Sequence, residues 1–318
     1  MYKVLIEVPT WLGDCVMTTP AIENIINLHP DIDITIFGSA VSTRVFEHHP
    51  NVKSIVIDES RGQKFRILYL YKQAKQLGRF DCTISFRRTL ASKLFVWFFK
   101  AGLKGNYRRY TKQAIHQAVR YNDFINKVFK KNTSAGQLII YKGPEIKTVK
   151  SDKKTLGINP GASYGSAKRW YPQKFAKVAS ELSSEYDIVI FGGPGEKDIA
   201  GDIEKILAEN GVKNYQNLAG NTTIPGLIEH ISNLDLFITG DSGPMHVAAA
   251  FQIPTVVIFG PTKDDETSQW MNEKSTIVKK NLECQPCMKR TCPLQHHDCM
   301  NLIKAVDVLQ SIKNLSSD

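Results

Sequence analysis

One stretch decides the fold of this chain, residues 234–250, which read LDLFITGDSGPMHVAAA. Its first six residues are mostly apolar and predict a buried parallel strand, and the residues from Met245 onward predict a helix. A turn of small residues lies between them. This arrangement directs free backbone N–H groups and the positive end of the helix dipole toward an anion. We therefore expect a phosphate group at the carboxyl edge of an α/β sheet, close to Asp241, Ser242, Gly243 and His246.

The same alternation of strands and helices runs through the 318 residues. Apolar, strand-like runs occupy residues 4–8, 32–37, 54–57, 82–86, 156–159, 188–191, 236–239 and 255–259. Helical patterns occupy residues 20–28, 39–48, 67–77, 174–185, 199–209, 224–232 and 245–251. Strands alternating with helices predict an α/β protein with parallel sheets and right-handed crossovers.

A polar, lysine-rich stretch, residues 142–154, separates two such series and is the candidate linker. We expect an N-terminal domain over residues 1–152 and a second domain over residues 153–300, both doubly wound. A last helical pattern within residues 301–318 is expected to pack back on the first domain.

The charge of the chain is uneven. Residues 1–155 carry 26 Lys and Arg against 12 Asp and Glu, whereas the remainder carries 15 against 19. An anionic partner of the first half is one explanation, and a solubilising surface is the other. The longest central apolar run, residues 94–99, is too short to span a bilayer, and the N-terminus lacks the pattern of a signal peptide. We expect a cytoplasmic protein.

Three further loops follow predicted strands. Asp14, after the first strand, is placed to act as a general base or to cap a helix, and Trp11 beside it to stack on a sugar or fill space. Residues 159–170 (NPGASYGSAKRW) combine glycines, hydroxyls and Lys168 as a phosphate-binding loop would, without the spacing of a P-loop. Residues 191–196 (FGGPGE) end with Glu196, which is a ribose ligand or a helix first-turn acid. His246 is a diphosphate ligand or a structural residue.

Six motifs occur in the order of one known family: LGD at 12–14, the 159–170 loop, the 191–196 loop, LAG at 218–220, the 240–250 turn and FGPT at 259–262. The chain resembles the ADP-heptose:lipopolysaccharide heptosyltransferases, glycosyltransferase family 9, from residue 12 to about residue 300. The resemblance implies a GT-B fold, in which two Rossmann-like domains face each other across a central cleft. It also implies inverting, metal-independent transfer of heptose from ADP-heptose to a phosphorylated lipid A-Kdo-heptose acceptor, with no cofactor required.

The resemblance also implies roles for individual residues. Asp14 becomes the catalytic base, and Lys168 the cation that balances the charge of the departing ADP. The nucleotide-sugar site would comprise Ser163, Tyr164, Lys168, Glu196, Thr222, Asp241, Ser242, Gly243 and His246. The acceptor site would include Trp11, Arg87, Arg88 and Ser92, in a basic segment that could also meet the cytoplasmic leaflet of the inner membrane.

Four cysteines crowd one short segment, at Cys284, Cys287, Cys292 and Cys299. Their density is that of a structural zinc site, although the spacing matches no standard finger or ribbon, and reduced thiols are the alternative.

Two other functions stay open at this point. One is a related transferase with another donor or acceptor, such as heptosyltransferase I, and the other is a basic nucleic-acid-binding protein. The second leaves the three turns of the second half unexplained and shows no known module, so we expect no nucleic-acid partner.

Overall fold

The computed structural model describes residues 1–144 and 152–315, which form two compact units divided between Gly143 and Pro144. The division falls inside the polar stretch 142–154 and ahead of the boundary that the sequence predicted at residue 152. Residues 145–151 of that stretch lie outside the described residues. No helix in the described ranges is long and apolar enough to cross a bilayer.

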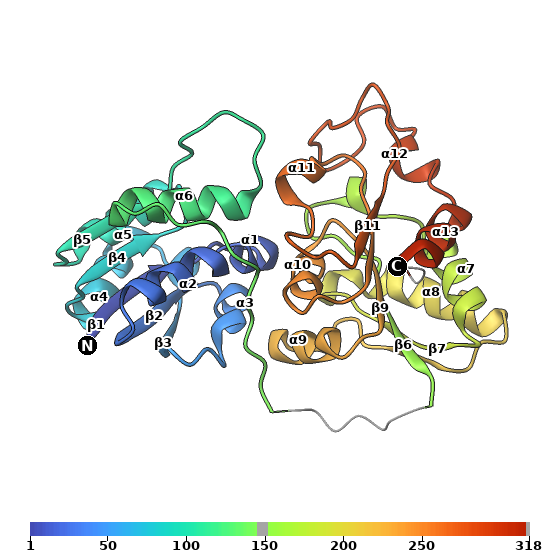
Figure 1. Ribbon diagram of the computed structural model, residues 1–318, viewed down its shortest axis with the longest axis horizontal. Helices are drawn as coiled ribbons and strands as arrows, with labels where there is room; N and C mark the ends of the chain where they lie inside the picture. Colours follow the sequence, from blue (N-terminus) through green and yellow to red (C-terminus); the bar gives the residue numbers. More distant parts are fainter. Residues whose placement is uncertain (145–151, 316–318) are drawn as a thin grey trace. The chain divides into compact units, whose positions relative to one another are not determined.

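The first unit is built on a five-stranded parallel sheet in the order β3-β2-β1-β4-β5 (Figure 1). Its strands are β1 Tyr2–Glu7, β2 Ile32–Gly38, β3 Val52–Ile57, β4 Cys82–Ser85 and β5 Leu103–Asn106. Its helices are α1 Leu12–Val16, α2 Thr19–Leu28, α3 Ala40–Thr43, α4 Arg66–Leu77, α5 Leu90–Phe98 and α6 Gln117–Phe129, with short 3₁₀ turns η1 Arg44–Phe46 and η2 Ser60–Gly62. Helix α2 packs on α6, and α4 packs on α5.

The second unit has a six-stranded parallel sheet in the order β11-β10-β9-β6-β7-β8. Its strands are β6 Lys154–Asn159, β7 Tyr186–Ile190, β8 Tyr215–Asn217, β9 Leu236–Gly240, β10 Thr255–Ile258 and β11 Ser275–Val278. Its helices are α7 Pro172–Leu182, α8 Lys197–Glu209, α9 Ile224–Ser232, α10 Gly243–Ala250, α11 Asp264–Thr267, α12 Asp298–Asn301 and α13 Ala305–Leu315, with 3₁₀ turns η3 Ser166–Lys168 and η4 Pro194–Glu196. Helix α7 packs on α8, and α9 packs on α10.

Each sheet reverses its strand order once. In the first unit the chain leaves β1 toward β2 on one side, and the strand on the other side is β4. In the second unit β6 has β7 on one side and β9 on the other. Loops that leave two such neighbouring strands diverge to opposite faces of the sheet, so a ligand crevice forms at their carboxyl ends. The loop of Asp14 follows β1, the loop of Lys168 follows β6, and the loop of Asp241 follows β9.

The eight strands predicted from apolar runs are confirmed, and three were missed: β5, β8 and β11. All three lie at an edge of a sheet. Edge strands are covered less completely, and these are only three or four residues long. Their sequences therefore lack the continuous apolar run that marks a central strand.

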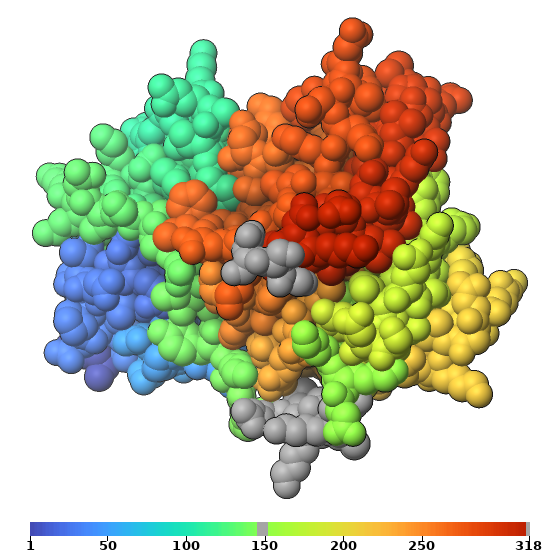
Figure 2. All heavy atoms as spheres, turned by 45° about the vertical axis from the view of Figure 1, so that its right-hand side comes forward, coloured from blue at the N-terminus to red at the C-terminus, as the bar shows by residue number. Residues whose placement is uncertain are grey.

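The C-terminal helix belongs to the second unit. Helix α13 packs on α7 and β11 within the second unit, where Figures 1 and 2 show it in dark red beside α7. Val308 and Ile312 are buried in the apolar core of that unit. The apolar side of α13 therefore packs in the core of the second unit.

Replacing Ile312 tests this packing. Because Ile312 is 5% exposed, Ile312→Ala should lower the free energy of unfolding by about 2–5 kcal/mol. Val306, on the same helix, is 63% exposed, so Val306→Ala should change it by less than about 0.5 kcal/mol. Urea unfolding measures both, and equal effects of the two substitutions would contradict the described packing.

Candidate active site

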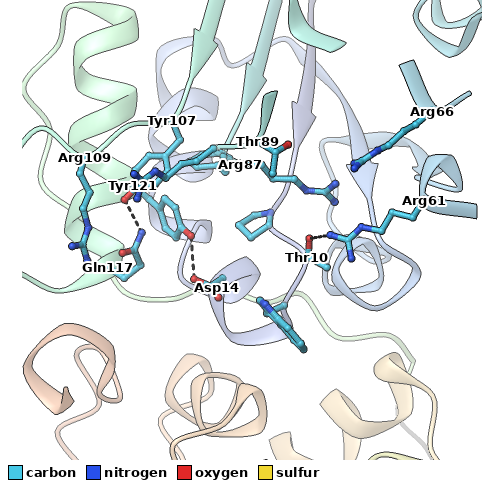
Figure 3. A pocket seen from close by; sticks show the side chains of 14 residues that line it. Thr10, Asp14, Arg61, Arg66, Arg87, Thr89, Tyr107, Arg109, Gln117 and Tyr121 are labelled. Carbon is cyan, nitrogen blue, oxygen red and sulfur yellow. Dashed lines mark hydrogen bonds between the residues drawn. The ribbon is translucent and has the colours of Figure 1, made fainter. Parts of the chain in front are cut away.

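The first unit has a pocket of about 570 Å³ at the carboxyl ends of β1 and β4 (Figure 3). Its walls come from the loop after β1, the loop after β4, the η2–α4 region, the loop after β5 and α6. The lining residues are Pro9, Thr10, Trp11, Asp14, Arg61, Arg66, Phe86, Arg87, Arg88, Thr89, Tyr107, Arg109, Gln117 and Tyr121. The pocket thus lies at the point where the strand order reverses.

Asp14 lies in this pocket, in the first turn of α1. The N-cap position of α1 is Trp11, so Asp14 is not the capping residue. The hydroxyl of Tyr121 donates a hydrogen bond to Asp14 Oδ1 at 3.2 Å. Burial, and next the charge of Asp14, raise the pKa of Tyr121 well above its usual value. Tyr121 is therefore a neutral donor that fixes the carboxylate of Asp14.

Arg87 is held by a buried network beneath the pocket. Its Nη1 lies 2.8 Å from Asp58 Oδ2 and 3.3 Å from Glu7 Oε1, and its Nε donates to the carbonyl of Val8 at 2.7 Å. Burial raises the pKa of Glu7, against the opposing effect of Arg87. Burial would also raise the pKa of Asp58, but hydrogen bonds from Ser60 and Arg87 outweigh it and lower that pKa.

The network leaves part of Arg87 for a ligand. Within the described residues, Nη2 of Arg87 has no hydrogen-bond partner. Because Arg87 also lines the pocket, an anion there would meet a guanidinium that is already fixed in place.

The other predicted acceptor residues differ in position. Trp11, 52% exposed, and the exposed Arg88 line the pocket. Ser92 does not: it is buried, and its hydroxyl donates to Glu7 Oε1 at 3.0 Å. Ser92 therefore supports Glu7, and we do not carry it forward as a ligand of the acceptor.

Sequence reasoning missed four residues of this pocket: Arg61, Arg66, Gln117 and Tyr121. They come from η2, α4 and α6, so no local motif unites them. The available signal was the charge of the segment from Ser60 to Asn122, which holds fifteen Lys and Arg residues and one acid, Asp81.

In the second unit, the loops after β6 and β9 meet through side chains. The amide of Asn159, the last residue of β6, donates to Ser242 Oγ at 3.3 Å. The hydroxyls of Thr239 and Ser242 lie 2.9 Å apart. Ser242 is the N-cap of α10, and Gly243 and His246 lie in its first turn. The N-terminus of an eight-residue helix is thus held against the β6 loop.

Lys168 and Asp241 join these loops directly. Lys168 Nζ lies 2.5 Å from Asp241 Oδ2, and Thr262 Oγ1 donates to the same oxygen at 2.6 Å. Asp241 is buried, and the side chain of Lys168 is 12% exposed. The carboxylate of Asp241 therefore positions a cation at the reversal point of the sheet.

Tyr164 and Ser163 precede Lys168 in the β6 loop. The Tyr164 hydroxyl donates to the carbonyl of Met288 at 2.7 Å, so it is occupied within the unit. Lys168 Nζ and the guanidinium of Arg290 lie 4.7 Å and 5.3 Å from the centre of its ring. Tyr164 therefore serves as a platform for two cations. Ser163 is exposed.

Glu196 lies against the backbone of the β6 loop. Its Oε2 accepts a hydrogen bond from the N–H of Gly193 at 2.7 Å, and a Cβ at position 161 would overlap its carboxylate. Gly161 is thus required for this close approach. Thr222, in the loop after β8, directly precedes Thr223, the N-cap of α9. Both side chains lie on loops at the carboxyl side of the sheet.

The cysteine segment does not assemble the zinc site considered above. In the part of the chain that the structure describes, no three His, Cys, Asp or Glu side chains are grouped to hold a metal, and the six cysteines are free thiols. Burial, and then its fellow cysteines 287, 292 and 284, raise the pKa of Cys299 to about 11. The segment is held by other contacts: the carbonyl of Arg290 accepts from the N–H of Ala167 at 3.0 Å, and the N–H of Met288 donates to the carbonyl of Pro261 at 2.9 Å.

Two parallel α/β units, each with its functional loops at the reversal point of the sheet, form the GT-B architecture of nucleotide-sugar glycosyltransferases. Two solved structures share this fold. The glycosyl transferase family 9 protein of Veillonella parvula has a TM-score of 0.85 and 21% identity, covering 99% of this chain and 97% of its own. The ADP-heptose lps heptosyltransferase II of Escherichia coli has a TM-score of 0.77 and 21% identity, covering 98% of each chain.

Sequence comparison gives the family. Residues 70–297 match the description "Glycosyltransferase family 9 (heptosyltransferase)". The Lipooligosaccharide heptosyltransferase 2 of Campylobacter jejuni is 41% identical over 323 residues, covering 98% of both proteins. The chain belongs to glycosyltransferase family 9, and it is a heptosyltransferase.

The Arg87 network gives a pH-dependent prediction. Because folding lowers the pKa of Asp58, its charge stabilises the fold above the unfolded pKa, and that stability is lost as the pH falls through the folded pKa. Asp58→Asn should therefore cost about 3 kcal/mol at pH 7, and the cost should shrink below about pH 4.

Urea unfolding at neutral and acid pH measures this difference. Asp31→Asn, at an exposed position, is the control with the same loss of charge. A penalty for Asp58→Asn that did not change with pH would contradict the assignment.

Proposed function

We propose that this enzyme transfers heptose, with inversion, from ADP-L-glycero-D-manno-heptose to the heptosyl-Kdo inner core of lipopolysaccharide or lipooligosaccharide. The observation that carries the proposal is the arginine-lined pocket around Asp14, at the reversal point of the first sheet. A hydroxyl-bearing acceptor with phosphates or carboxylates fits such a pocket. The name of the 41% identical relative supports the second heptose as the one transferred.

The donor would bind to the second unit. The N-terminus of α10, with Ser242, Gly243 and His246, supplies donors for a diphosphate. Lys168, held by Asp241, supplies a cation at the same reversal point. Ser163 and Tyr164 would complete the phosphate loop, Glu196 would hold the ribose, and Thr222 would lie near the adenine.

In the reaction, Asp14 accepts the proton of the attacking acceptor hydroxyl. The oxygen of that hydroxyl forms a bond to the anomeric carbon of heptose as the bond from that carbon to the β-phosphate oxygen breaks. Attack opposite the leaving group inverts the anomeric centre. ADP departs with the electron pair, and its growing charge is stabilised by Lys168 and the α10 N-terminus, without a metal ion.

The acceptor would be bound by fixed cations. Arg87 is held by Glu7 and Asp58, and Arg61 donates to Thr10 Oγ1 at 3.2 Å (Figure 3). Arg88, Arg109 and Trp11 complete the wall. Since this acceptor is anchored in lipid, we also propose that the enzyme works in the cytoplasm, at the surface of the inner membrane.

The first test is ADP release by Asp14→Asn, with ADP-heptose and an inner core that carries one heptose. Loss of the base should lower kcat about 10²–10⁴-fold while ADP binding, measured by calorimetry, is unchanged. Lys168→Ala is the contrasting variant: it should lower kcat about 10²-fold and also weaken ADP binding. Full activity of Asp14→Asn would overturn its role as the base.

Metal independence is tested by measuring ADP release in excess EDTA. Activity should be unchanged, and its loss would overturn metal independence.

The second test separates acceptor from donor. Arg61→Ala removes one pocket cation and should raise KM for the acceptor about tenfold, because a charged hydrogen bond contributes about 1.5 kcal/mol or more. KM for ADP-heptose should stay constant. Lys213→Ala, at an exposed position of the second unit, controls for charge.

The identity of the acceptor is tested with wild type. If it released ADP only with an inner core that carries no heptose, the enzyme would transfer the first heptose and not the second.

A further inference from the structure

Helices α4 and α5 pack on each other in the first unit (Figure 1). Large apolar side chains on and beside these helices are exposed to solvent. We name this surface the α4–α5 face. It comprises five residues with the exposed fractions Phe65 66%, Leu68 50%, Tyr71 41%, Leu90 72% and Trp97 70%. Single exposed apolar residues are ordinary, but five on two packed helices form a patch that marks an interaction surface.

The two helices present these residues as one surface. Leu68 and Tyr71 are three residues apart on α4, and Leu90 and Trp97 are seven apart on α5, so each pair lies along one side of its helix. The half-buried ring of Phe98 joins the helices: it lies 5.4 Å from the ring of Tyr71 and 5.7 Å from that of Trp97. The patch is therefore continuous across α4 and α5.

Lysines lie beside and between the apolar residues of this face. Lys64 Nζ lies 5.7 Å from the ring centre of Phe65, and Lys75 Nζ lies 5.5 Å from that of Tyr71. The other exposed lysines on the two helices and at the end of α5 are Lys72, Lys93 and Lys100. The one acid between Ser60 and Asn122 is Asp81, which directly precedes β4 and accepts a hydrogen bond from the N–H of Lys3 at 2.8 Å.

The face begins where the acceptor pocket ends. Arg61, Arg66 and Thr89 line the pocket. Phe65 immediately precedes Arg66, and Leu90 immediately follows Thr89, so the apolar residues start at the rim of the pocket. A molecule that rests on the face would thus be next to whatever enters the pocket.

We propose that the α4–α5 face docks on a bilayer of anionic lipid, with its apolar side chains in the headgroup region and its lysines on the phosphates. The inference rests on the proposed function, since a lipid-anchored acceptor would then reach the pocket from the same surface. Apolar side chains interspersed with lysines match the two terms of interfacial binding, apolar burial and attraction to anionic lipid. Two copies of the face would repel each other, and Leu68 and Leu90 offer nothing to a nucleic-acid backbone.

The experiment is sedimentation of the full chain with vesicles of phosphatidylethanolamine and phosphatidylglycerol, against vesicles of phosphatidylcholine. Wild type should bind the anionic vesicles more tightly, and less so at high salt. Lys72→Ala/Lys75→Ala should bind about 25-fold more weakly, at about fivefold for each lysine. Trp97→Ala should bind about tenfold more weakly. Lys213→Ala/Lys274→Ala and Val306→Ala, on exposed positions of the second unit, should bind as wild type does.

Activity on a deacylated, soluble inner-core acceptor separates this inference from the proposed function. The variants of the face should keep wild-type activity on it and lose activity on the same acceptor in vesicles. Absence of vesicle binding, or equal losses in the control variants, would overturn the docking surface while soluble activity upheld the enzyme. Binding of single-stranded RNA in place of vesicles, or dimers broken by Trp97→Ala, would also overturn it. Vesicle binding without activity on either acceptor would uphold the surface and overturn the proposed function.

Discussion

The constraint on which this structure depends is the reversal of strand order in two parallel sheets. Between β1 and β4, and again between β6 and β9, the chain departs in opposite directions from neighbouring strands. The loops after these strands diverge to opposite faces of the sheet, so their polar groups line a crevice at the carboxyl ends of the strands. Asp14 and Arg87 follow one pair of strands, and Lys168 and Asp241 follow the other. The topology thus brings together residues that are 73 positions apart in each unit.

The second requirement is that the charges at these edges be held before a substrate arrives. Arg87 is fixed by Glu7 and Asp58, and Lys168 by Asp241. A buried ion pair gives little net stability, because desolvation offsets most of the attraction. Its value here lies in geometry, since a cation that is already desolvated and oriented needs little reorganisation when an anion binds.

The sequence predicted those features whose signal lies within a short segment. The central strands are continuous apolar runs, and the 240–244 turn carries its own small residues, so fold class and the loops of the second unit could be read directly. It failed where the signal was distributed: Arg61, Gln117 and Tyr121 meet Asp14 only after the sheet has formed. For the cysteine segment it left a zinc site and reduced thiols as alternatives, and within the described residues these thiols are not grouped as metal ligands. Ser92 was misread in another way, because its place after a basic loop gave no hint of its bond to the buried Glu7.

The cysteine segment has a consequence for how this protein can change over evolution. Main-chain atoms of Met288 and Arg290 bond the loops at Pro261, Tyr164 and Ala167. These bonds are made by main-chain atoms, so they would remain after substitution of either side chain, whereas the contact of the Arg290 guanidinium with the ring of Tyr164 would be lost. An insertion or deletion of one residue would shift every donor and acceptor out of register. The length of this segment is therefore under stricter constraint than its composition.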